Sequence, residues 1–389
     1  MTPEGWQKTT LGALCAAGGG EIQTGPFGSQ LHARDYVRHG VPVVMPQDIV
    51  DGLIDTSAIA QVRERDAARL AKHRLRANDV VYSRRGDVRK CALVTPEQEG
   101  WLCGTGCLRV RVGDAAYGPF IGAYLTSRAT QDWVENNAVG LTMLNLNTGI
   151  LSRVPVALPP EHEQRAVVEV LNAYGSLAAV RTTTRQRLIE LRRALLSELA
   201  RTDGDGTLTL ADLAEVELRQ VAPSRTSGST RYVGMEHLAG ETRGLIGHGR
   251  SSEVASQKVP FCEGDVLFGK LRPYLRKIAL APFDGIASTE ILVIRPRSGV
   301  DAQFLYYRLC APDVLSWIER HSEGTRMPRV SATNLLALPV GNPDSAALAI
   351  SEALNRVDDQ IAAARESSTG NDRVGLGLRD DLLAGEVRV

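Results

Sequence analysis

The chain repeats itself at long range, and this repetition limits the possible folds more than any other feature. Trp133-Val134-Glu135 recurs as Trp317-Ile318-Glu319, 184 residues later. The same spacing holds for Gly140 and Gly324, Met143 and Met327, Leu151 and Leu335, and Pro155-Val156 and Pro339-Val340. Because a repeat of this length corresponds to a pair of domains rather than a solenoid, we expect a tandem duplication. Each unit is a globular part of about 150 residues, an ordinary domain size, followed by a helix.

The longest helical pattern runs from Glu161 to Arg201, a span of 41 residues without proline. Apolar residues recur there every three to four positions, as they do on one face of a helix. Such a helix is about 60 Å long, so we expect a spacer or a partner-binding helix rather than an ordinary core helix. The polar run at residues 181–187 interrupts the apolar face, and we expect a bend or a weakly packed waist at that point.

The globular parts mix two kinds of pattern, which predicts an α+β fold in both units. Short apolar runs bounded by Gly, Pro and Asp indicate strands at Val41–Met45, Asp79–Tyr82, Leu108–Val112, Val266–Phe268 and Glu290–Ile294. We expect helices over Phe120–Asn136, Gln303–His321 and Ser345–Arg365, an interruption at Ser367–Gly377, and a last short helix over Leu378–Ala384. The predicted organisation is domain 1 at residues 1–157, a spacer helix at 158–202, domain 2 at 203–342 and a helical region at 343–389.

Composition narrows the function only slightly. The N-terminus lacks the basic and apolar segments of a signal peptide, and no apolar run reaches the roughly 18 residues that a membrane helix needs. We therefore expect a cytoplasmic protein that does not enter a membrane. The six cysteines are scattered without metal-finger spacing, so we expect reduced thiols and no metal site. The net charge is +0, but 39 of the 45 cations are arginines, the residue suited to bidentate contacts with guanine and phosphate.

Motifs recur in the same order in both units. The first unit carries Gly25-Pro26-Phe27-Gly28-Ser29, Val80-Val81-Tyr82-Ser83-Arg84-Arg85-Gly86, Gly104-Thr105-Gly106, Leu144-Asn145-Leu146-Asn147 and Glu163-Gln164. The second carries Gly264-Asp265-Val266-Leu267-Phe268-Gly269-Lys270-Leu271-Arg272-Pro273-Tyr274, Ser288-Thr289-Glu290 and Gly324-Thr325-Arg326-Met327-Pro328-Arg329-Val330-Ser331. Together they resemble the DNA-specificity subunits of Type I restriction–modification systems, over essentially the whole chain. The second unit departs from the family pattern after Val340, where a second Pro-Pro and Glu-Gln are expected.

The resemblance implies two target-recognition domains, each reading half of a split sequence in double-stranded DNA, held apart by two antiparallel helices. It implies no catalytic residues and no metal. The expected partners are two methyltransferase subunits and, in full systems, two restriction–translocase subunits. S-adenosylmethionine, ATP and magnesium are expected on those partners only.

Two basic clusters lie at equivalent places in the units. The first holds Arg84, Arg85, Arg89 and Lys90, and the second holds Lys270, Arg272, Arg276 and Lys277. Both combine cations with strand-forming or aromatic residues, as expected where phosphate contacts lie beside base contacts. A solvated edge strand is the alternative interpretation. The predicted DNA-contacting residues are Phe27, Ser29, Gln30, Gln47, Arg84, Arg85, Arg89, Lys90, Thr105, Asn145, Asn147, His237, Lys270, Arg272, Tyr274, Arg276, Lys277, Thr289, Arg326 and Arg329. The predicted partner-binding residues of the helix are Val167, Leu171, Leu188, Leu191 and Leu195.

The sequence contains no complete motif of a nucleotide-binding enzyme, a metal-dependent nuclease or an amino-methyltransferase. Residues 264–270 fit the spacing of a phosphate-binding loop, but Leu271 stands where Ser or Thr must follow. A metal-dependent nuclease commonly has an acidic residue two positions before a lysine, and no lysine of this chain is preceded in that way. The Asn/Asp-Pro-Pro-aromatic run of an amino-methyltransferase does not occur either. Two alternatives to DNA recognition stay open at this level, namely an uncharacterised hydrolase and a protein-interaction scaffold that does not bind DNA.

Overall fold

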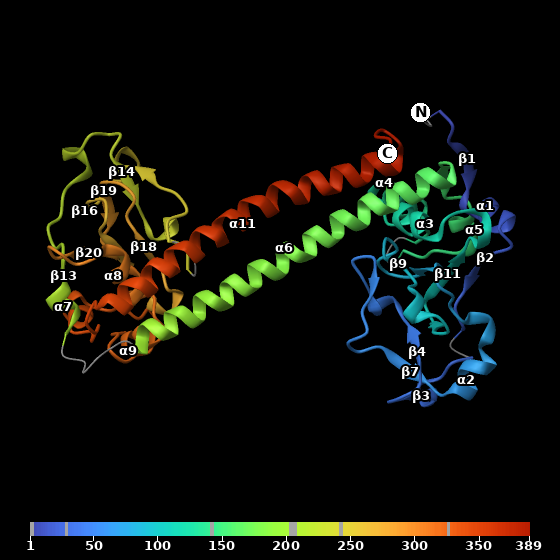
Figure 1. Cartoon of the computed structure of the whole chain (residues 1–389), viewed down its shortest axis with the longest axis horizontal. Helices are drawn as coiled ribbons and strands as arrows, with labels where there is room; N and C mark the ends of the chain where they lie inside the picture. Colours follow the sequence, from blue (N-terminus) through green and yellow to red (C-terminus); the bar gives the residue numbers. More distant parts are fainter. Residues whose placement is uncertain (1–3, 28–29, 141–143, 202–207, 241–243, 325–326) are drawn as a thin grey trace. The chain divides into compact units, whose positions relative to one another are not determined.

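The computed structural model describes residues 4–27, 30–140, 144–201, 208–240, 244–324 and 327–389 (Figure 1). It divides into two compact units, Met1–Ala179 with Thr369–Val389 (unit 1) and Val180–Ser368 (unit 2). Two long helices, α6 (Glu161–Arg201) and α11 (Ser345–Ala384), contribute one segment to each unit. Each unit therefore consists of a globular part and two helix segments.

The globular part of unit 1 holds two four-stranded sheets. The first sheet is antiparallel and has the order β2 (Glu21–Thr24), β11 (Cys107–Arg111), β8 (Val80–Ser83) and β9 (Cys91–Leu93). The second has the order β10 (Leu102–Cys103), β4 (Val41–Val44), β7 (Ala60–Val62) and β3 (Tyr36–Val37), with β10 parallel to β4. Two further pairs are β1 (Gln7–Thr10) with β12 (Pro155–Leu158) and β5 (Ile49–Val50) with β6 (Leu53–Ile54).

Unit 2 repeats this plan. Its first sheet has the order β13 (Ala214–Val216), β20 (Ile291–Pro296), β17 (Val266–Gly269) and β18 (Ile278–Leu280). Its second has the order β15 (Gly249–Arg250), β14 (Arg231–Val233), β19 (Gly285–Ser288) and β16 (Lys258–Phe261), and β14 and β19 again form a parallel pair. The predicted duplication of an α+β domain is confirmed.

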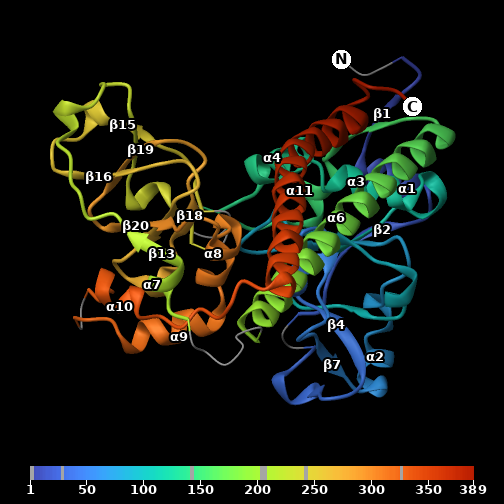
Figure 2. The ribbon, with the colours of Figure 1, turned by 60° about the vertical axis from the view of Figure 1, so that its left-hand side comes forward.

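In each unit the first sheet lies between the helices and the second sheet, as Figures 1 and 2 show. Strand alternation explains this layering, because successive side chains point to opposite faces. In β8, Val80 and Tyr82 join the core beneath the helices, whereas Val81 joins the core between the sheets. In β17, Val266 and Phe268 face the helices and Leu267 faces the second sheet.

A buried ion pair explains the Asp-Val motif that precedes both central strands. Asp79 accepts two hydrogen bonds from Arg111, at 2.7 and 2.5 Å, and a third from its own turn at the Arg76 backbone N–H. Asp265 does the same with Arg295, at 3.1 and 2.8 Å, and with the Cys262 N–H. Each aspartate therefore closes a turn and ties its strand to the neighbouring strand, β11 or β20.

The short helices also correspond between the units, except that α2 has no counterpart among the described helices of unit 2. Unit 1 has α1 (Leu11–Ala17), α2 (Glu64–Arg69), α3 (Gly118–Leu125), α4 (Arg128–Asn137) and α5 (Thr148–Ser152). Unit 2 has α7 (Leu210–Leu213), α8 (Ala302–Leu309), α9 (Pro312–Arg320) and α10 (Ala332–Leu336).

The single helices expected over Phe120–Asn136 and Gln303–His321 are wrong, because each segment forms two helices. Ser127 caps the start of α4 by accepting a hydrogen bond from the Thr130 N–H. Pro312 occupies the first turn of α9, where its missing N–H does no harm.

Helix α6 has the predicted bounds, but α11 does not have the predicted interruption at 367–377. Gly375 is buried, and a Cβ at this position would lie 2.1 Å from the Tyr174 Cζ of α6. The glycine therefore serves close helix packing within unit 1 and does not end the helix. Since α6 enters unit 2 from unit 1 and α11 enters unit 1 from unit 2, the two segments in each unit run in opposite directions.

Candidate nucleic-acid interface

Backbone hydrogen bonds bring three loops of unit 1 together at one end of its first sheet. The Arg84 N–H donates to the Gly106 carbonyl at 2.7 Å, and the Arg84 carbonyl accepts from the Leu146 N–H at 2.8 Å. A further bridge pairs Arg85 with Asn145. The segment after β8, the loop before β11 and the segment before α5 thus form one surface, which we call loop cluster 1.

The turn at Gly25 approaches loop cluster 1 so closely that only glycine fits. A Cβ on Gly25 would lie 2.0 Å from the Gly104 carbonyl oxygen, and the Gly25 N–H donates to the Cys107 carbonyl at 2.9 Å. The Gln30 N–H donates to the Phe27 carbonyl at 2.8 Å, and Phe27 is 60% exposed. An exposed aromatic ring is a suitable surface for stacking or groove contact.

Two more predicted residues join loop cluster 1. Thr105 is half-buried between Gly104, whose N–H donates to the Val44 carbonyl, and Gly106, which has a φ of +86° and lies against Pro46. Gln47 follows Pro46 and is exposed. The structure therefore brings side chains from four separate motifs of the sequence onto one surface.

Unit 2 builds loop cluster 2 in the same way. The Lys270 carbonyl accepts from the Val330 N–H at 3.2 Å, and the Arg272 N–H donates to the Pro328 carbonyl at 2.8 Å. Leu271 pairs with Arg329 as Arg85 pairs with Asn145. Thr289 lies beside this cluster, since the following carbonyl, that of Glu290, accepts from the Lys270 N–H at 3.0 Å.

A strained, exposed loop projects from loop cluster 2. Arg272 and Arg276 both have left-handed backbone conformations, with φ of 51° and 50°, and they flank a short 3₁₀ turn at Pro273–Leu275. Tyr274 is 49% exposed and Leu275 is 41% exposed. Non-glycine residues avoid this conformation unless the surroundings impose it, and such strain concentrates at functional sites.

The cations of the two clusters fall into two classes. Arg85 and Arg272 are exposed, and Lys90 and Lys270 are half-buried. By contrast, Arg89 pairs with Asp132 and Glu135 of α4, and the Lys277 ammonium donates to the Met235 carbonyl at 2.6 Å. Arg329 donates from Nε to Glu290 at 3.0 Å. For these three residues, contact with DNA stays a prediction and requires a change of partner.

Two buried polar atoms of loop cluster 1 have no hydrogen-bond partner within the described part of the chain, namely Arg84 Nε and Asn145 Oδ1. Buried polar groups are nearly always paired, so each exception calls for an explanation such as a missing ligand. Guanidinium and amide groups are also the groups that read base edges in DNA.

Other predicted residues have local structural roles. Asn147 caps α5 by accepting from the Ile150 N–H at 2.8 Å, as Ser331 caps α10. His237 Nδ1 accepts from the Gly234 N–H at 2.9 Å, and its ring lies edge-on to Tyr232. Ser29 and Arg326 lie outside the described residues. Sequence reasoning missed the carboxylates that hold Arg89 and Arg329, because the partners are far apart in the chain.

The predicted partner-binding residues differ in accessibility. Val167 is 3% exposed and belongs to the core of unit 1, and Leu171 and Leu195 pack partly against the cores of their units. Leu188 is half-buried, and Leu191 is 47% exposed. Exposed apolar side chains that the prediction omitted are Leu177, Val180 and Val374.

Residues 3–192 match the model of a family described as the Type I restriction modification DNA specificity domain. The specificity subunit of the type I restriction enzyme EcoDI of Escherichia coli is 31% identical over 90 residues, which is 23% of this chain and 20% of that protein. A protein of Methanocaldococcus jannaschii assigned as the MjaX type I specificity subunit is 20% identical over 385 residues, 90% of this chain and 88% of that one. Residues 3–192, just under half of the chain, therefore carry a Type I restriction–modification DNA specificity domain.

The following solved structures share the fold of this chain. A chain from a type I restriction–modification system studied for its complex assembly and conformational transition aligns with a TM-score of 0.57 and 18% identity over 100% of both chains. The HsdS subunit of Thermoanaerobacter tengcongensis aligns with a TM-score of 0.51 and 18% identity over 99% of this chain and 98% of that one. The S subunit from M. genitalium aligns with a TM-score of 0.52 and 13% identity, over 97% and 96% of the two chains. None of the described helices combines the length and apolar character required to cross a bilayer.

Proposed function

We propose that this chain is the DNA-reading subunit of a Type I restriction–modification enzyme and that it has no catalytic activity of its own. Each unit reads one half of a bipartite target in double-stranded DNA. The observation that supports this most strongly is the duplicated loop cluster, in which the Arg85–Asn145 pairing of unit 1 recurs as Leu271–Arg329 in unit 2. Matching scaffolds with different side chains at the matching positions are what two half-sites of different sequence require.

The side chains of the clusters are suited to different tasks. Exposed cations such as Arg85 and Arg272 would contact phosphates, which position the protein without reading sequence. Asn145 and Arg329 have the donor and acceptor groups that distinguish adenine and guanine edges in the major groove. Phe27 and Tyr274, both substantially exposed, supply apolar and stacking contacts beside them.

The long helices would dock two methyltransferase subunits, and two restriction–translocase subunits where the system also cleaves DNA. Their exposed apolar side chains, Leu177, Val180, Leu191 and Val374, are the contacts we assign to this docking, because helices bind partners through apolar side chains that recur at helical spacing. S-adenosylmethionine, ATP and magnesium would bind to those partners.

Mapping of methylated bases across a genome tests the proposal. Cells that carry the methyltransferase subunit should show methylation at one bipartite motif only when this chain is present. Purified chain alone should neither methylate nor cleave DNA. Turnover by a pure sample would favour the hydrolase alternative, and a chain that assembles with partners but never directs methylation would favour a scaffold that does not bind DNA.

A segment exchange then tests the assignment of one half-site to each unit. Replacing Leu208–Val340 with the equivalent segment of a relative should change one half of the methylated motif and leave the other half intact. The reciprocal exchange of residues 5–157 is the matched control and should change the opposite half. If either exchange alters both halves, the two units form one composite reading surface.

A further inference from the structure

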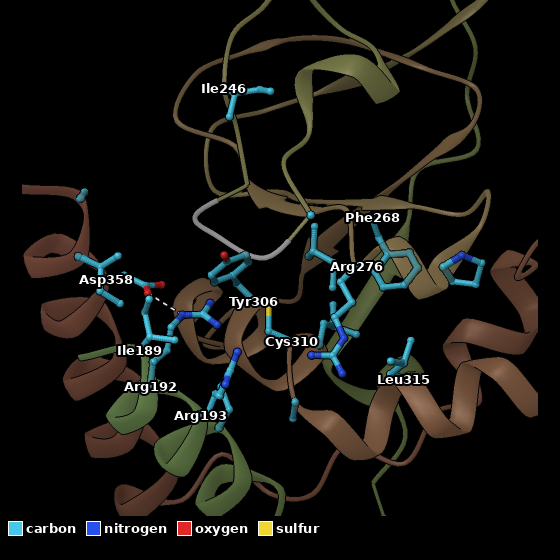
Figure 3. Close-up of a pocket in the computed structure, with 18 of the residues that line it drawn as sticks. Ile189, Arg192, Arg193, Ile246, Phe268, Arg276, Tyr306, Cys310, Leu315 and Asp358 are labelled. Atoms are coloured by element: carbon cyan, nitrogen blue, oxygen red, sulfur yellow. Dashed lines mark hydrogen bonds and ion pairs between the residues drawn. The ribbon is translucent and has the colours of Figure 1, made fainter. Parts of the chain in front are cut away.

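Unit 2 contains a cavity of about 400 Å³ bounded by α6, α8, α9, α11 and the strained loop of loop cluster 2 (Figure 3). Its floor is apolar and consists of Leu196, Phe268, Ile278, Leu309, Leu315 and Ile318. A cavity of this size with an apolar floor and a few polar groups at its rim has the character of a small-molecule site.

The rim of the cavity carries an excess of positive charge. Its charged residues are Arg192, Arg193, Arg276, Arg365, Asp358 and Glu366, four cations against two anions. The Arg192 charge is already neutralised, because its Nε donates to Asp358 at 2.6 Å (Figure 3). The other oxygen of Asp358 accepts from the Tyr307 hydroxyl at 3.1 Å, so this carboxylate is fully engaged. Arg193 and Arg276, both exposed, remain to meet an incoming anion.

Cys310 also lines the cavity, and it does not make the site a covalent one. Burial raises the pKa of the Cys310 thiol to about 11. The thiol is therefore neutral at physiological pH, and the neutral form is a poor nucleophile. In this cavity Cys310 acts as a small apolar side chain, and binding there is non-covalent.

Comparison with unit 1 shows that Arg276 lacks the ion pairs of its equivalent. In the repeat, Arg276 corresponds to Arg89, which is neutralised by Asp132 and Glu135. The position equivalent to Asp132 is Ser316 in unit 2, whereas Glu319 stands at the position of Glu135. Arg276 forms no ion pair with Glu319 or with any other described residue.

A second difference between the units, in the partners of Arg192 and Arg379, explains why the cavity is open in unit 2. Arg192 corresponds to Arg379, which bonds to Thr126 and to the Ala123 carbonyl at the end of α3. Cys310 replaces Thr126 in unit 2, and Asp358 attracts Arg192 toward α11 instead. The side-chain contacts made at this place in unit 1 are therefore missing in unit 2, and a charged cavity lies there instead.

We propose that this cavity binds an amphipathic anion, with a carboxylate or phosphate head between Arg193 and Arg276 and an alkyl or aryl body on the apolar floor. Guanidinium groups match both kinds of head through paired charge-assisted hydrogen bonds. The apolar body gains affinity by leaving water. The inference concerns unit 2 alone and does not depend on DNA recognition.

Calorimetric titration of the full-length chain with octanoate, octyl phosphate and octan-1-ol tests this proposal. At least one of the two anions should bind at a single site, about tenfold or more tightly than the neutral alcohol, which is the effect of one charge-assisted hydrogen bond. The anion that binds more tightly identifies the head group. Equal binding of the alcohol and both anions, or no binding of either anion, overturns the proposal.

Variants locate the site. Arg193→Gln should weaken binding of the anion by about tenfold and leave DNA affinity unchanged, whereas a loss of DNA affinity with unchanged anion binding would show that Arg193 serves DNA. Leu315→Trp fills the floor and should abolish binding of the anion. Arg187→Gln removes an exposed cation of α6 outside the cavity and should bind the anion as the natural chain does. Unchanged anion binding by Leu315→Trp contradicts the assignment to this cavity.

Discussion

The division of the basic clusters into exposed and internally held cations predicts which arginines contribute to DNA affinity. Arg85 and Arg272 are exposed, whereas Arg89 is paired with Asp132 and Glu135. Each lost phosphate contact lowers the slope of log K against log salt by about 0.9. Replacing Arg85 and Arg272 together by alanine should therefore flatten the slope by about 1.8.

The same slope gives the expected loss of affinity. One phosphate contact raises the DNA-binding constant about eightfold at 0.1 M salt relative to 1 M salt, so two contacts raise it about sixty-fold. The measurement is fluorescence anisotropy of target DNA, titrated with the chain in its methyltransferase complex over a series of salt concentrations. The loss should be similar for target and unrelated DNA, because phosphate contacts carry no sequence information.

Arg89→Ala and Lys277→Met are the matched controls, since each removes one cation from the same clusters. Neither should change the salt slope. Arg89→Ala removes partly exposed ion pairs and should cost at most about 1 kcal/mol of unfolding free energy. Lys277→Met removes the bond to the Met235 carbonyl and should cost about 1–3 kcal/mol. If Arg89→Ala flattens the slope as much as Arg85→Ala does, the internal ion pairs open on DNA and the division is wrong.

Three further predictions concern the long helices and one buried histidine. Gly375→Ala should destabilise the end of α11 relative to Gly377→Ala by about 1–3 kcal/mol, measured by hydrogen exchange, because a Cβ at Gly375 meets Tyr174 whereas nothing lies within 4 Å of one at Gly377. Similar exchange in the two variants would contradict the close packing. Four residues inserted within Thr182–Thr184, where the side chains are exposed, should lengthen α6 by about 6 Å and rotate its C-terminal segment by about 40° about the helix axis. We expect the unspecified spacer of the methylated motif to grow by one or two base pairs, and an unchanged spacer with full activity would show that α6 does not measure DNA. Burial, together with the charge of Lys72, lowers the pKa of His73 from 6.5 to about 4, so its neutral form stabilises the fold above pH 6.5 and this contribution is lost as the pH falls toward 4. The unfolding free energy should drop by roughly 3 kcal/mol over that range, and His73→Leu should remove most of this dependence if the assignment is right.

The sequence by itself determined the duplication, the α+β class and the bounds of α6. The short apolar runs that form β8 and β17 and the long helical period of residues 161–201 are local patterns, and they can be read without knowing what packs against them. Asp79-Val80 and Asp265-Val266 also recur in the sequence, each at the start of an apolar run. The ion pairs with Arg111 and Arg295 that explain this recurrence became visible only in the folded chain.

Only the tertiary structure decided what each arginine and glycine does. Arg85 and Arg89 look alike in sequence, yet one is exposed and the other is held by carboxylates of α4 more than forty residues away. Gly375 looks like a helix breaker, and packing against Tyr174 makes it part of a continuous helix. The physical reason is the same in both cases. Local conformational preference depends on neighbours in the chain, whereas neutralisation of a charge and close packing depend on side chains that folding brings together from distant positions.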